Sequence, residues 1–321
     1  MKRRAVCVVF ILLTFMMCAF GEDVAFSLTT DAAYYPLSAA IPAADGNRFC
    51  PVTGPYDGAE ARTTFQASYT IPVPFGDNPL VSGNTLVLNG AFELTPITIK
   101  PGVSFSFTPI AFLVFSGGAD VATGWDIGDG LVAAGTYNDA THKYDSLGAF
   151  NSCWYDAWFE GLFQFDLAAI VPGDWNHIVT QDSFRITYAK LAGQEDGHPW
   201  LWQASKEKVN GLAYTATFIV GYQMPLVLNT VAIQTEINGR FKDDMAAQYA
   251  GYKSDFTTYS VNPVFIFKFN EHNSLTTQLC FSSRRGFADE LDPDTQSKLD
   301  MTVTGSEWSF YRIAFSWKYA F

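Results

Sequence analysis

The sequence is short of cysteine, histidine, charge and helical periodicity, and each shortage excludes a class of structure. Its 321 residues include five cysteines and four histidines. These are too widely spaced for a zinc motif or a disulfide framework. After the N-terminus, no run approaches the ~20 apolar residues that a membrane helix requires. Apolar residues rarely recur at the helical period of 3.6 residues. Any membrane crossing must therefore be made by strands.

Residues 1–21 have the three parts of a secretory signal peptide. Lys2, Arg3 and Arg4 are basic, residues 5–17 are apolar, and small residues precede a cleavage point after Gly21. The apolar run is too short to span a bilayer comfortably. We therefore predict a secreted or envelope protein that begins after residue 21.

The chain that remains after this cleavage is strongly acidic. It keeps 17 basic and 32 acidic residues, a net charge of −15. Such a charge argues against nucleic acid or anionic headgroups as partners. Cys50, Cys153 and Cys280 remain, and an odd number of thiols allows one disulfide at most. We expect no metal and no cofactor.

What the sequence does contain is alternation of apolar and polar residues at period two, which is typical of strands with two different faces. It is also rich in aromatic residues, with 28 Phe, 15 Tyr and 8 Trp. We predict ten strands, around residues 65–73, 86–94, 103–115, 155–165, 184–188, 212–222, 227–237, 259–269, 275–281 and 308–321.

The final strand has the most regular pattern. Its apolar face consists of Tyr311, Ile313, Phe315, Trp317, Tyr319 and Phe321. Its other face consists of Arg312, Ala314, Ser316, Lys318 and Ala320. This strand resembles the closing strand of bacterial outer-membrane β-barrels, in which the C-terminal Phe and the preceding aromatics are the signal read by the assembly machinery.

The resemblance implies an all-β fold, an antiparallel transmembrane barrel of 10–12 strands in a bacterial outer membrane. Its implied partners are the membrane lipid and, through the C-terminal strand, the barrel-assembly machinery. A soluble β-sandwich or lipocalin-like barrel alternates too, with its apolar face inward. The terminal Phe321, the strand lengths and the connection lengths favour the membrane barrel.

The connections alternate in length, as expected for short periplasmic turns and long extracellular loops. Counted back from the C-terminus, the alternation is long, short, long, short, long, moderate, long and short. The corresponding residues are 283–306, 270–274, 238–257, 224–225, 192–211, 167–176, 116–153 and 96–102. The next connection, 75–84, should be long and is only moderate.

Two segments leave the strand number open. We assign the barrel to residues 63–321, whereas residues 22–62 are extra strands, a periplasmic tail or a plug. A strand near 24–28 with a partner near 48–53 would raise the number from ten to twelve. The long connection 116–153 could also contain a hairpin around 125–137.

The polar face of each strand would line the lumen. The predicted lumen charges are Glu93, Asp156, Glu160, Arg185, Glu236, Lys268, Arg312 and Lys318. Opposed charges across a narrow lumen select solutes by sign; alternatively, these residues pair and simply fill the interior. Barrels of 10–12 strands lie between filled barrels of eight and open porins of 16–18. We therefore predict a narrow channel for the passive passage of small hydrophilic solutes.

A hydrolase with its active site at the outer rim is an alternative to a channel. Asp196 and His198 resemble the Asp-x-His element of outer-membrane aspartyl-type proteases, and His142 and Ser146 are a weaker match to a lipolytic site. We interpret these histidines as solvated loop residues and favour a protein that is not an enzyme. The acidic segment 289–294 could offer oxygen ligands to Ca²⁺, but a solvated loop fits it better.

The remaining alternative is an adhesin or structural barrel that does not conduct. Its binding surfaces would be the long loops 116–153 and 283–306.

Overall fold

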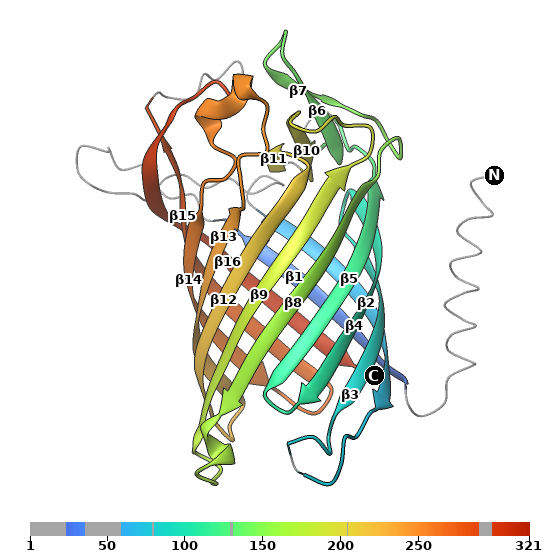
Figure 1. The fold of residues 1–321 in the computed structure, drawn as a ribbon, viewed down its shortest axis with the longest axis vertical. Coiled ribbons are helices and arrows are strands. Elements are labelled where there is room, and N and C mark those ends of the chain that lie inside the picture. The colour runs from blue at the N-terminus through green and yellow to red at the C-terminus, as the bar shows by residue number, and fades with distance from the viewer. Residues whose placement is uncertain (1–23, 36–58, 79, 129–130, 204, 289–296) are drawn as a thin grey trace, which may run out of the picture.

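Twelve of the described strands form one closed antiparallel barrel in the computed structural model (Figure 1). The structure describes residues 24–35, 59–78, 80–128, 131–203, 205–288 and 297–321. The wall strands are β1 Val24–Tyr34, β2 Ala59–Pro72, β3 Thr85–Leu94, β4 Thr98–Ile110, β5 Leu113–Gly124, β8 Trp154–Asp166, β9 His177–Leu191, β12 Gly211–Gln223, β13 Leu228–Arg240, β14 Thr258–Lys268, β15 Asn273–Phe287 and β16 Val303–Ala320. The predicted fold class is confirmed.

The barrel is closed by the first and last strands. β1 pairs with β16 in a register that runs from Ser27 opposite Ala320 to Tyr34 opposite Ile313. On its other edge β1 pairs with β2. Every wall strand therefore has two neighbours, which satisfies the backbone N–H and C=O groups that lipid cannot.

The outer surface of the wall is apolar. On β8 the exposed side chains are Tyr155, Phe159, Phe163 and Phe165, which alternate with the inward Trp158 and Glu160. The most exposed of the four is Phe159, at 52%. Large apolar side chains on the outside of a closed sheet are what acyl chains require and water does not. The alternation in the sequence thus corresponds to an apolar exterior and a polar interior.

A second, smaller sheet lies inside one end of the barrel. It has the order β11-β10-β6-β7, with bounds β6 Ala134–Asn138, β7 Lys143–Ser146, β10 Trp200–Trp202 and β11 Ser205–Lys208. Figure 1 shows these strands at the end where the long connections gather, opposite the C-terminus. We call this sheet the inner sheet and this end the mouth.

The inner sheet is held against the wall by an apolar cluster. Trp200 and Trp202 of β10 pack with Ala122 of β5 and Leu191 of β9, and all four are buried. Trp154 of β8 stacks on Trp202, with ring centroids 5.7 Å apart. The inner faces of β5, β8 and β9 are therefore apolar at this height because another strand covers them.

Only short helices occur in the described part of the chain, η2 Leu167–Ala169 and η3 Ala247–Tyr252. Within those same residues, no helix has the length and hydropathy needed to cross a membrane.

The predicted strand at 103–115 is wrong, because the structure divides it into β4 and β5. The chain turns at Ala111 and Phe112, with Ile110 opposite Leu113 in the ladder. The turn itself contains no Gly, Asn or Asp, and apolar residues continue through it. Pro109, just before Ile110, is the one local signal of a break, and the prediction did not use it. Contacts with the connection before β3 and with β8 hold it: the Ala111 N–H donates to Leu80 O, and the Gln164 N–H donates to Phe112 O.

Because of this additional turn, each connection before β4 lies at the opposite end of the barrel from the one predicted. The connection 73–84 lies at the C-terminal end of the barrel with the short turns, whereas 95–97 lies at the mouth (Figure 1). The expectation that 75–84 would be a long loop at the mouth is therefore wrong. From 125 onward, the long connections lie at the mouth as predicted.

Two differences from the ten predicted strands raise the number to twelve. β1 is an additional strand, and the predicted strand 103–115 is divided into β4 and β5. β1 covers the strand expected near 24–28, but its partner is β2, which begins at Ala59. The partner expected near 48–53, and the signal peptide at 1–21, lie outside the described residues. The hairpin expected around 125–137 occurs later, as β6 and β7 of the inner sheet.

Candidate functional site: the charged lumen

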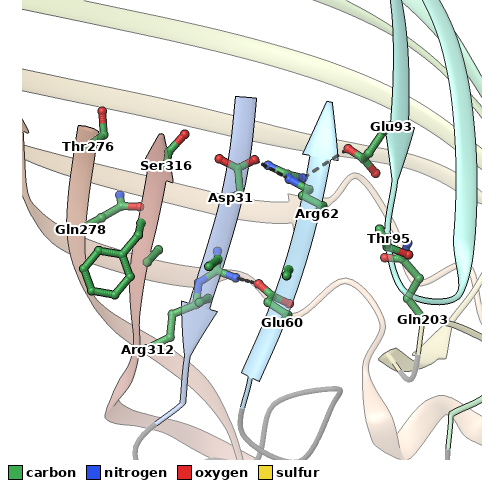
Figure 2. Close-up of a pocket in the computed structure, with 15 residues that line it drawn as sticks. Asp31, Glu60, Arg62, Glu93, Thr95, Gln203, Thr276, Gln278, Arg312 and Ser316 are labelled. Atoms are coloured by element: carbon green, nitrogen blue, oxygen red, sulfur yellow. Dashed lines mark hydrogen bonds and ion pairs between the residues drawn. The ribbon is translucent and has the colours of Figure 1, made fainter. Parts of the chain in front are cut away.

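Charged side chains on the inner face of β1, β2, β3 and β4 form one connected group. Strand register places Asp31 opposite Arg62 and Glu93 opposite Lys100. The Arg62 Nε–H donates to Asp31 Oδ2 at 2.7 Å, and Arg62 Nη1 lies 3.6 Å from Glu93 Oε2. Lys100 Nζ lies 3.5 Å from the same Glu93 oxygen. Two acids and two bases thus balance one another across four strands, and Figure 2 shows three of them, Asp31, Arg62 and Glu93.

A second group on the same inner wall joins β16 to β1 and β2. Arg312 Nη1 donates to Glu60 Oε1 at 2.5 Å and to the hydroxyl of the buried Tyr35 at 3.3 Å. Figure 2 shows the Glu60–Arg312 pair beside the Asp31–Arg62–Glu93 chain. The charges of Glu60 and Arg312 therefore also cancel.

A β-bulge in β16 places a further aromatic residue on the inside. Cys280 pairs with Arg312 and Phe281 with Phe310, so Tyr311 is an extra residue in the ladder. The two bulged residues share a face, and the Tyr311 ring lies 5.2 Å from that of Tyr35. The predicted alternation of β16 therefore fails at Tyr311, which lies on the same side as Arg312, and holds from Ile313 to Tyr319.

A cavity of about 240 Å³ opens between these two groups. Besides the charged residues, its lining includes hydroxyl and amide side chains: Thr95, Gln203, Thr276, Gln278 and Ser316. Gln203 belongs to the turn between β10 and β11, and its amide donates to the Thr98 hydroxyl of β4. The inner sheet therefore reaches the cavity and narrows the lumen there.

The adjoining wall, formed by β5, β8 and β9, has its own charges. The Arg185 Nε–H donates to Glu160 Oε2 at 2.9 Å, and its guanidinium lies 4.1 Å from the Trp158 ring centroid. Asp120 and Asp156 are opposite each other in the β5–β8 ladder. This wall thus carries one balanced pair and one pair of acids.

The structure brings some of the predicted lumen charges together and leaves others apart. Glu93, Arg312 and the Glu160–Arg185 pair belong to the groups above. Glu236 accepts from the Gln234 amide at 2.6 Å, and Gln278 in turn donates to Gln234 at 3.3 Å. Lys268 and Lys318 both face Ser274 in the ladder, at the end opposite the mouth, and are exposed.

The inward charges that sequence reasoning missed include Asp31, Glu60, Arg62, Lys100 and Asp120. The first three lie in the segment whose structure was left open, and the last two lie on strands whose ends were misplaced. The alternation of Phe26 and Leu28 with Ser27, Thr29 and Asp31 is the signal that would have found β1.

The side chains considered for rim catalysis hold loops together. The His198 Nε2 lies 2.9 Å from Tyr137 O, and Asp196 Oδ1 accepts from the Asn210 amide at 3.1 Å. His142 pairs with Asp300 at 2.7 Å, whereas Ser146 donates to Asp126. Neither predicted combination is a hydrogen-bonded pair.

The described residues contain no cluster of side chains suited to a metal ion. The acidic segment 289–294 lies outside them. Of the three expected thiols, Cys153 and Cys280 are free, and Cys50 is outside the described residues.

Comparisons with known proteins agree on the fold but assign the chain to no family. No family model and no curated protein matches the chain. Solved structures to which it is similar include a "KdgM porin" (9% identity, TM-score 0.37, 92% of this chain and 99% of that one). Another is the COG4313 outer membrane channel from Pseudomonas putida F1 (9%, 0.47, 94% and 97%). A third is the outer membrane channel DcaP of Acinetobacter baumannii (11%, 0.34, 93% and 96%). With TM-scores this low, the closed strand order itself is what establishes the barrel.

Proposed function

We propose that the chain forms a narrow passage for small hydrophilic solutes across a bacterial outer membrane. The observation that carries the proposal is a closed barrel that is apolar outside and charged and hydroxylated inside. An apolar exterior suits lipid, and closure removes every unpaired strand edge. The polar interior offers a solute groups that replace part of its hydration.

The passage is expected to be narrow for two reasons. A wall of twelve strands lies between barrels filled by side chains and open porins. The inner sheet then occupies part of the mouth, because Trp200 and Trp202 pack on the inside of the wall. A wide general-diffusion pore does not fit this arrangement.

Around the cavity the charges largely cancel. Asp31 and Glu93 are balanced by Arg62 and Lys100, and Glu60 by Arg312. A polar surface with little net charge suits neutral hydroxylated solutes as well as ions. The sign of any ion preference should then depend on the charges at the two ends of the lumen.

The test is single-channel recording of the mature protein, refolded and inserted into a planar bilayer. Heat-modifiable migration on a gel should first confirm that the barrel is folded. We expect discrete ohmic steps that are smaller than those of a 16-stranded porin. Folded protein without current steps would contradict the proposal.

The inner sheet also supports a second candidate, a barrel that does not conduct and acts through its outer loops as an adhesin or structural protein. β10 and β11 lie inside the mouth and reach the lumen cavity through Gln203. In that case, deleting the hairpin 134–146 and the segment 199–208 together should still give no current.

A further inference from the structure

A separate pocket of about 470 Å³ lies inside the mouth, beside β14, β15 and β16. Thr258, Ser282, Arg284 and Ser309 line it from these strands. Ser282 and Arg284 share a face with the inward Cys280, and Ser309 is opposite Ser282 in the ladder. Ser282, Arg284 and Ser309 therefore line the pocket from the lumen side of the wall, and Arg285 reaches it from the other face of β15. We call this pocket the vestibule.

The vestibule gathers positive charge in an otherwise acidic chain. Arg284, Arg285 and Lys298 all line it. Arg284 Nη2 is 3.2 Å from Glu307 Oε2, so one of the three charges is balanced within the wall. The other two have no comparable carboxylate partner within salt-bridge distance among the described residues.

Arg285 is held rigidly at the vestibule wall. Its guanidinium lies 4.2 Å from the Tyr252 ring centroid and donates to Tyr252 O at 3.0 Å and to Lys253 O at 2.9 Å. Backbone carbonyls orient this cation without neutralising it. The Tyr252 hydroxyl and Ser254 O accept further guanidinium N–H groups, so an anion that enters the vestibule meets a fixed positive charge more than free hydrogen-bond donors.

Lys298 is the third cation, and both Glu207 and three bases act on it. Burial lowers the pKa of its ammonium group; Glu207 opposes this shift, whereas Arg284, Arg285 and Lys206 add to it through repulsion. Glu207 itself lies in the inner sheet, and burial raises its pKa. An anion bound at the vestibule would relieve the repulsion among the three bases that line it.

The hydroxyl groups define the rest of the ligand. Thr258, Ser282 and Ser309 add hydroxyl groups on the same wall as the cations. Each donates its proton to a backbone carbonyl, which leaves its oxygen able to accept a hydrogen bond from a hydroxyl of the ligand. The volume falls within the ~300–1,000 Å³ that is usual for small-molecule sites. Arginine and lysine side chains bind carboxylate and phosphate groups. Because hydroxyl groups lie beside them here, the ligand that fits is an organic anion that also carries hydroxyl groups.

We propose that the vestibule is a binding site for small hydroxylated anions, with an acidic monosaccharide as the fitting class. This inference rests on the proposed passage of solutes and names the solutes that the mouth would select. The charge-balanced cavity below the vestibule would not repel such a solute.

The experiment is isothermal titration calorimetry of the refolded full-length mature protein in detergent, with glucuronate as the probe and glucose as its neutral match. We expect glucuronate to bind at least about tenfold more tightly, because the cations recognise only the carboxylate. Lys298→Gln should weaken glucuronate binding by about tenfold, the effect of losing one charge-assisted hydrogen bond. Lys143→Gln, on the exposed β7, is the matched control and should change nothing.

Equal binding of the two sugars, or glucuronate binding unchanged by Lys298→Gln, would overturn the site. Because Lys298 lies in a connection, heat-modifiable migration should show that its variant still folds. Binding does not depend on current, so the two proposals fail separately. Anion binding without conductance would contradict the proposed passage and support the binding site. Conductance without anion binding would support the passage and contradict the binding site.

Discussion

At the scale of single residues, the lumen is organised by register. Asp31 meets Arg62, and Glu93 meets Lys100, because antiparallel pairing places them directly opposite. Cross-strand pairs of opposite charge stabilise a sheet modestly, by roughly 0.2–1 kcal/mol each. Their larger effect is to cancel charge at the cavity, so that removing one partner should change selectivity more than stability.

Arg312 provides the clearest test of this cancellation. Arg312→Gln should leave the Glu60 carboxylate without its cation and shift the passage toward cations. The measurement is the reversal potential under a KCl gradient. The double variant Glu60→Gln/Arg312→Gln should return most of the way to the original value, because it removes both charges.

Lys318→Gln is the control for position. It removes one positive charge from β16 at the end opposite the mouth, away from the Glu60 carboxylate. Adding Glu60→Gln to this control should not restore its reversal potential. Equal rescue in both backgrounds would show that Glu60 and Arg312 do not act as a pair.

At the scale of elements, the inner sheet depends on a few large apolar contacts. Trp202 is buried, stacks on Trp154 and belongs to the cluster that fixes β10 to the wall. Trp202→Ala should cost about 3–5 kcal/mol of local stability and loosen the inner sheet. We expect larger current steps and faster hydrogen exchange of the β10 and β11 amides.

Trp175→Ala is the matched control for that variant. Trp175 is 52% exposed in the connection between β8 and β9, at the end opposite the mouth. Its loss should leave both the current steps and the exchange of β10 unchanged. If the two variants behave alike, the inner sheet does not limit the passage.

The closing strand leads to a prediction about assembly. Phe321 is 67% exposed, and its N–H donates to Phe26 O, so its side chain adds little to the folded barrel. Deleting Phe321 should reduce the heat-modifiable form in cells if the assembly machinery reads this residue. Refolding of the purified variant into detergent should proceed as before.

Phe269→Ala supplies the comparison, because Phe269 is a similarly exposed aromatic residue at the same end of the barrel. It should assemble normally in cells. Normal assembly of the Phe321 deletion would contradict its role as a signal.

Elements differed in how far the sequence could predict them. β8 was predictable because Tyr155, Phe159 and Phe163 alternate with polar residues and one face meets lipid along its length. β4 and β5 were predicted as one strand because apolar residues continue through their turn, which only Pro109 marks. The inner sheet was hidden because β10, the segment Trp200–Trp202, is buried on both faces and shows no alternation. The lumen pairs depended on register, which single-strand patterns do not contain.

At the scale of the whole molecule, closure depends on β1. β1 is the only described strand that joins β2 to β16. Deleting residues 24–34 should expose two unpaired edges, which lipid does not tolerate. We expect this variant to lose heat-modifiable migration and to aggregate on refolding.

The comparison for that deletion is removal of the hairpin 134–146. This hairpin belongs to the inner sheet and not to the wall. The wall should therefore still close, and the variant should keep its heat-modifiable form. Closure of the variant without 24–34 would show that β2 and β16 can pair directly.

The attachment of β10 has a consequence for how the passage would respond to voltage. The residues that anchor it, Trp200, Leu201 and Trp202, carry no charge and are all buried. An electric field therefore finds no charge on β10 itself, and lifting the strand would bring two indoles into water. We expect a passage of fixed width whose current is proportional to the applied potential, without voltage-dependent closure.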